Sequence, residues 1–91
     1  MIKTKLVTAN ATPVELSFAS PVKGHYKIII TNTSANKHVL IGGSDLSLTN
    51  YGLRAEHDAP PVIIENVPFQ DSIYAISEDG SNITVAVMVI E

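Results

Sequence analysis

Short runs of β-branched residues, separated by turn-forming residues roughly every ten positions, constrain the fold of this chain most strongly. Nowhere do apolar residues recur at the three- and four-residue spacing of an amphipathic helix over a useful length. The pattern predicts one all-β domain covering residues 1–91, built as an antiparallel β-sandwich or a small jelly-roll-like barrel of about seven strands. The expected strands are Ile2–Val7, Val14–Phe18, His25–Thr31, Lys37–Ile41, Val62–Asn66, Ser72–Ser77 and Asn82–Ile90.

The centre of the chain has the pattern of a β-hairpin. Two apolar runs, Tyr26–Thr31 and His38–Ile41, flank the short polar segment Asn32–Lys37. A second tight hairpin is expected at Glu78–Ser81, where turn residues separate two further runs. Pro60-Pro61 predicts an edge-like start for the following strand, Val62–Asn66, because proline cannot donate a ladder hydrogen bond.

Between these runs, Gly42–Asp58 is expected to be the longest irregular segment. Its glycine and asparagine residues suit turns, and its polar side chains can bond their own backbone. Leu46, Leu48 and Leu53 are expected to hold the segment against the body of the protein. The sequence therefore predicts a folded loop presented by a pair of strands.

Composition excludes several classes of protein. Hydrophobic residues make up 45% of the 91 residues and charged residues only 16%, too apolar a chain for intrinsic disorder. The net charge of −3 and the scattered basic residues argue against a nucleic-acid partner. Without cysteine there is no disulfide framework or thiolate metal site. No apolar run approaches the roughly 20 residues of a membrane helix, and no signal-peptide pattern is present, so we expect no membrane partner and synthesis in the cytoplasm.

The last expected strand is apolar on both faces. Ile83, Val85, Val87 and Val89 point to one side, whereas Thr84, Ala86, Met88 and Ile90 point to the other. A two-layer domain has a single interior, so the second face needs another cover. Either a flanking loop or the first strand folds over it, or a neighbouring subunit covers it. We favour the subunit.

No set of residues has the spacing of a catalytic or metal site. His25, His38 and His57 lack the short spacing that places two rings on one local face. Gly42-Gly43-Ser44-Asp45 lacks the Lys-Ser/Thr of a phosphate loop, and Asp45 with Asn50 lacks the ligand spacing of a calcium loop. The chain is therefore expected to be non-enzymatic and to use no cofactor.

Three segments resemble small tailed-phage virion proteins. They are Ile-Thr-Asn-Thr-Ser at 30–34, Val-Leu-Ile-Gly-Gly-Ser-Asp at 39–45 and Leu-Thr-Asn-Tyr-Gly-Leu at 48–53. The end of the family's pattern is also matched, by Asp71–Ser77 followed by Gly80 and the valine-rich last strand. The likeness therefore covers roughly residues 14 to 90. At Asp58–Pro61 the chain departs from the pattern, which has a glycine-containing turn there.

The resemblance implies a structural protein of the virion that decorates or cements a capsid. Its partners would be the major capsid protein or other virion proteins, and further copies of itself in a homo-oligomer such as a trimer. The residues expected to make these contacts are Ser44, Asp45, Asn50, Tyr51, Arg54, Ala86, Met88 and Ile90. The alternative is a carbohydrate-binding or fibre-tip module that uses the Gly42–Asp58 loop, with Tyr51 as its aromatic platform.

Overall fold

A computed structural model describes residues 2–17, 24–34, 37–56, 60–68 and 71–90, which form eight strands and no helix. These described ranges contain no helix that is long and apolar enough to cross a membrane. The prediction of an all-β fold is confirmed. The strands are β1 (Ile2–Ala9), β2 (Val14–Glu15), β3 (His25–Asn32), β4 (His38–Gly42), β5 (Leu53–Glu56), β6 (Val62–Pro68), β7 (Tyr74–Ser77) and β8 (Ile83–Ile90).

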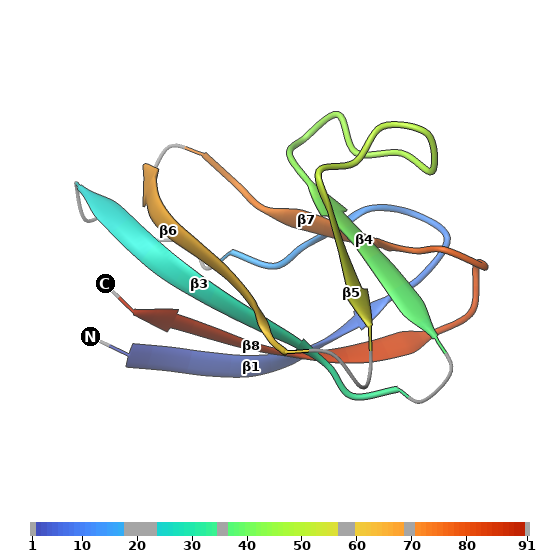
Figure 1. The fold of residues 1–91 in the computed structure, drawn as a ribbon, viewed down its shortest axis with the longest axis horizontal. Coiled ribbons are helices and arrows are strands. Elements are labelled where there is room, and N and C mark those ends of the chain that lie inside the picture. Colours follow the sequence, from blue (N-terminus) through green and yellow to red (C-terminus); the bar gives the residue numbers. More distant parts are fainter. Residues whose placement is uncertain (1, 18–23, 35–36, 57–59, 69–70, 91) are drawn as a thin grey trace.

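The strands form two antiparallel sheets that pack together as a sandwich (Figure 1). The first sheet has the order β1-β8-β3-β6 and the second the order β2-β7-β4-β5. Strands pair in a nested way, β1 with β8, β2 with β7, β3 with β6 and β4 with β5. The chain is thus one long two-stranded ribbon, with the β4–β5 connection at its tip, rolled into two layers. This is the arrangement of a jelly roll.

The core lies between the sheets and consists mainly of β-branched side chains. Alternate residues of β3 and β8 point into it, as the sequence predicts, and Ile28, Ile30, Val85 and Ile83 are fully buried there. The second sheet contributes Val39, Ile41, Ala55 and Ala75 to the same core. The expected core position of Phe18 lies outside the described residues.

The predicted hairpin of Tyr26–Thr31 with His38–Ile41 is wrong, because β3 and β4 belong to different sheets. Asn32 holds the crossing between them. Its buried side-chain amide donates to Lys37 O at 2.8 Å and to Ala55 O at 3.1 Å, on the second sheet. The predicted hairpin at Glu78–Ser81 is also wrong, since this turn carries the chain from β7 in one sheet to β8 in the other.

The segment Gly42–Asp58 is shorter as a loop than predicted, because Leu53–Glu56 forms β5 and pairs with β4. Of the three leucines expected to hold the loop, only Leu46 is buried; Leu48 is 53% exposed and Leu53 43%. The strand β5 is hard to recognise in the sequence because only one of its four residues, Ala55, is buried.

Candidate interaction surfaces

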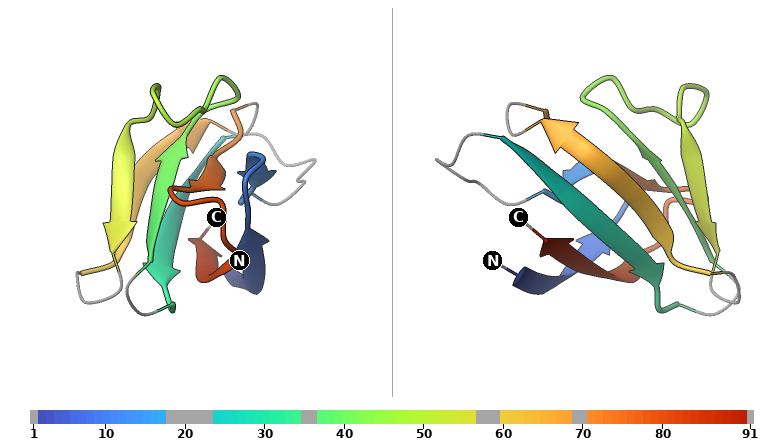
Figure 2. Two further views of the ribbon diagram at one scale, coloured as in Figure 1. Left: turned by 90° about the vertical axis from the view of Figure 1, so that its right-hand side faces the viewer. Right: turned by 60° about the vertical axis from the view of Figure 1, so that its left-hand side comes forward.

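All four strands of the first sheet contribute apolar side chains to its outer face. We call these side chains the apolar face. Its members are Ile2, Leu6, Ile29, Ile63, Ala86, Met88 and Ile90. Strand pairing arranges them in rows: Met88 lies between Thr4 and Ile29, and Ala86 between Leu6 and Thr31. Figure 2 shows this sheet with no described segment lying over its outer side.

Exposure on the apolar face is high for such large side chains. Leu6 is 72% exposed, Ile2 64% and Met88 37%. A shallow hollow of about 280 Å³ lies in the middle of the face, lined by residues of β1, β3 and β8 around Ala86. This volume is below that of a typical pocket for a drug-sized ligand, and it suits one or two aliphatic side chains.

On the second sheet, the outward-facing apolar side chains are covered. Leu40 and Ile76 also point outward, yet both are buried, because Leu46 of the β4–β5 loop packs on them together with Tyr74. A loop therefore covers the outer face of the second sheet. On the first sheet, where such a cover was considered for the last strand, β1 pairs beside β8 rather than over it. The outer face of the first sheet is therefore the one that no described segment of the chain covers.

The sheet edges carry features that oppose pairing with another chain. On the edge strand β1, Lys3 and Lys5 occupy the inward-pointing positions opposite Val89 and Val87. Lys5 Nζ donates to Ser17 O at 3.1 Å, and burial lowers the pKa of Lys5. The strand β6, for which Pro60-Pro61 predicts an edge-like start, lies at the edge of the sheet along its whole length and is interrupted by a bulge opposite β3. The edges β2 and β5 are only two and four residues long.

The β4–β5 loop is ordered by its own backbone. Ser47 and Asn50 exchange two backbone hydrogen bonds, and the Asn50 side chain donates to Asp45 O at 3.1 Å. Gly52 N donates to Ile41 O at 2.9 Å and closes the loop onto β4. The loop therefore presents Tyr51, which is exposed, from a fixed base.

Arg54 makes its contacts within the molecule. It lies on the outer side of the second sheet, where its guanidinium bonds the Glu78 carboxylate and lies 2.7 Å from His38 Nδ1. The cluster of Arg54, His38 and Glu78 is polar and partly exposed.

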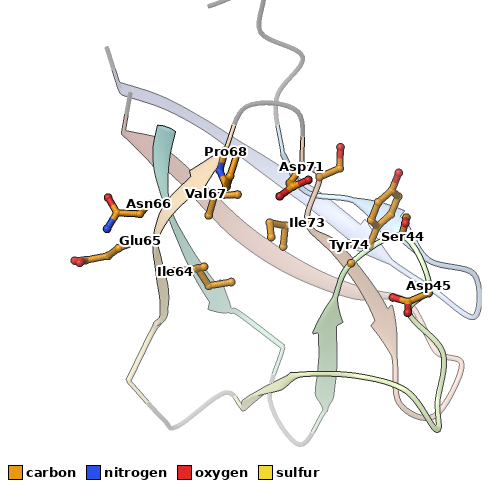
Figure 3. A pocket seen from close by; sticks show the side chains of 12 residues that line it. Ser44, Asp45, Ile64, Glu65, Asn66, Val67, Pro68, Asp71, Ile73 and Tyr74 are labelled. Carbon is orange, nitrogen blue, oxygen red and sulfur yellow. The ribbon is translucent and has the colours of Figure 1, made fainter. Parts of the chain in front are cut away.

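A groove of about 760 Å³ opens between β6 and the segment that leads into β7 (Figure 3). Ile64 and Ile73 line it together with the carboxylates of Asp45 and Asp71, and Tyr74 stands beside Ser44 at one end. The described residues that line it include no lysine or arginine. The groove can therefore offer hydrogen-bond acceptors and an aromatic ring to a neutral polar ligand.

The structure divides the expected contact residues among separate places. Ser44, Asp45, Asn50 and Tyr51 lie in the loop at one end of the molecule, and Arg54 lies on the outer side of the second sheet. Ala86, Met88 and Ile90 lie on the outer face of the first sheet. Sequence reasoning missed Ile2, Leu6, Ile29 and Ile63, whose membership follows only from the strand pairing.

The described histidines do not form a metal site. His25 lies on β3 and His38 on β4, in different sheets, and His57 lies outside the described residues. Over the described part of the chain, no three histidine or acidic side chains gather closely enough to hold a metal ion.

Comparison of the chain with protein-family models, with curated proteins and with solved structures finds no match in any of the three.

Proposed function

We propose that this protein is a non-enzymatic structural component that works by docking onto other proteins, as a decoration or cement protein on a phage capsid. The apolar face is the observation that carries the proposal. Soluble proteins rarely leave a contiguous apolar surface of this kind exposed unless it is an interaction site. The sequence resemblance to tailed-phage virion proteins supports the phage capsid as the place where it docks.

The form of the surface also favours a protein partner. The edge strands are blunted, which leaves the face of the first sheet rather than an edge as the docking surface. The exposed Leu48 and Tyr51 on the ordered β4–β5 loop give a second apolar contact at the ribbon tip. A decoration protein that holds both a capsid protein and another subunit needs two such surfaces.

Co-sedimentation with capsids that lack this protein tests the proposal. We expect the wild-type protein to pellet with such capsids at micromolar concentration, and the double variant Leu48→Ser with Tyr51→Ser to bind at least tenfold more weakly. The matched control is Thr12→Ser, in another exposed turn. Failure of the wild type to bind capsids would remove the decoration function.

A carbohydrate-binding function is the second candidate, and the groove favours it. Asp45 and Asp71 with Tyr74 combine acceptor oxygens and an aromatic ring, a combination typical of sugar sites. Jelly rolls occur both in viral capsid proteins and in lectins, so the fold does not separate the two candidates.

A glycan array with the wild type, Asp45→Asn and Tyr51→Ala separates them. The groove predicts glycan binding that Asp45→Asn removes and Tyr51→Ala leaves intact, because Tyr51 does not line the groove. Loss with Tyr51→Ala alone would place the site on the loop tip instead. No glycan binding by the wild type would remove the candidate.

A further inference from the structure

We propose that a second copy of this chain covers the apolar face, in a two-fold symmetric dimer whose first sheets stack face to face. The inference deepens the proposed function, on which it rests, by naming the occupant of that face. Stacking one surface on an identical surface requires self-complementary shape and charge. The apolar face has both.

The charge of the face suits self-association. Among the outward-facing residues of the first sheet, the full charges belong to Lys27 and Glu65, which lie 3.5 Å apart and neutralise each other. The chain as a whole carries a net charge of −3, so most of its excess negative charge lies elsewhere. Two copies can therefore approach through this face without placing like charges opposite each other.

The shape of the face combines protrusions with a hollow. Leu6 protrudes from β1, and the hollow of about 280 Å³ surrounds the small side chain of Ala86 in the same row. Under a two-fold axis, each Leu6 can enter the hollow of the other copy, so one contact is made twice. Sheets stacked in this way pack about 10 Å apart through interdigitating side chains.

The area of the face reaches the lower bound for a specific contact. Three strands of eight residues and one of seven, about 4.8 Å apart and rising about 3.3 Å per residue, present roughly 500 Å² of face. A pair of such faces buries about 1,000 Å² or more, the lower bound for a specific interface. An isologous contact of this kind closes at two copies, so it predicts a dimer and not a trimer.

Sedimentation equilibrium over low to high micromolar concentrations is the test, with Leu6→Glu as the variant and Leu48→Glu as the control. Both substitutions place a carboxylate at an exposed leucine, but only Leu6 lies on the apolar face. We expect a wild-type dimer, a dissociation constant raised at least tenfold by Leu6→Glu, and little change with Leu48→Glu. Circular dichroism verifies the fold of each variant. Independently of any variant, amide shifts of the wild type should change on dilution along β1, β3 and β8.

A wild-type monomer throughout, a trimer, or a dimer equally sensitive to both substitutions would overturn the inference. So would dilution shifts confined to the β4–β5 loop. Capsid binding is measured separately: a monomer that still binds capsids overturns the dimer alone, whereas a dimer that does not bind capsids removes the decoration function alone.

Discussion

Arg54 on β5 reaches past β4 and forms a two-pronged ion pair with Glu78, with Nη2 3.0 Å from Oε1 and Nε 3.0 Å from Oε2. Paired nitrogens and oxygens of this kind fix the guanidinium plane as well as its charge. Arg54 was expected to contact a partner protein. Its fork is already used to join β5 to the residue that follows β7, across the outer side of β4.

The ion pair predicts a small loss of stability on substitution. Arg54→Ala should lower the free energy of unfolding by about 0.5–1 kcal/mol, because both side chains are partly exposed and the pair is screened by solvent. Urea denaturation at low and high salt measures this loss, which should shrink at high salt. Lys27→Ala is the control, since the ion pair of Lys27 with the described residue Glu65 is one contact of 3.5 Å. An equal loss in the control would contradict the role of the two-pronged geometry.

Asp79 makes stability depend on acid pH. Hydrogen bonds from the Ser81 side chain and backbone, then from Lys37 and Ser77, hold the pKa of Asp79 well below its usual range. A carboxyl whose pKa is lower in the folded state stabilises the fold above its unfolded pKa of about 3.9 and loses that contribution as pH falls toward the folded value. Wild type should therefore exceed Asp79→Asn in urea midpoint at pH 7, and the difference should shrink below about pH 4. A difference that stays constant with pH would contradict this assignment.

The three consecutive isoleucines of β3 test the two faces of the first sheet. Ile28 and Ile30 are fully buried, whereas Ile29 points outward onto the apolar face. Ile30→Ala should lower the free energy of unfolding by about 2–5 kcal/mol, because it leaves a cavity in the core. Ile29→Ala should cost about 1 kcal/mol or less in dilute protein. Urea denaturation of both variants measures the contrast, and equal losses would contradict the assigned faces.

The alternation of side chains made the strands of the core predictable. Tyr26, Ile28 and Ile30 share one face of β3, and the four residues Ile83, Val85, Val87 and Val89 share one face of β8, both as the sequence indicates. Such periodicity reports burial directly because a strand repeats every two residues. The double apolar character of β8 was visible for the same reason.

The pairing of strands could not be predicted from the same pattern. Two β-branched runs joined by a short polar segment fit a hairpin and a crossing between sheets equally well, and Asn32 selects the crossing through contacts with residues distant in sequence. On β1, alternation separates Ile2 and Leu6 from Lys3 and Lys5 without saying which set faces the core. Pairing with β8 turns the lysines inward and exposes Leu6. The full extent of the apolar face depends on that register.

Asn66 gives a test of the bulge on the edge strand β6. Its φ of 56° is the one positive value among the described non-glycine residues. Asparagine tolerates this left-handed conformation, whereas a β-branched residue is strained there. Asn66→Val should lower the free energy of unfolding by about 1–2 kcal/mol, and Asn66→Gly should change it by about 0.5 kcal/mol or less.

Urea denaturation of both variants measures the cost, with Glu65→Val as the control on the neighbouring residue of the same strand. Glu65 has no positive φ, so valine at that position meets no such strain. If Glu65→Val and Asn66→Val lose the same stability, the cost comes from valine on this strand and not from the backbone of the bulge. If Asn66→Val alone is costly, the bulge requires a residue that accepts the left-handed conformation, and an edge that resists pairing with another chain depends on that residue.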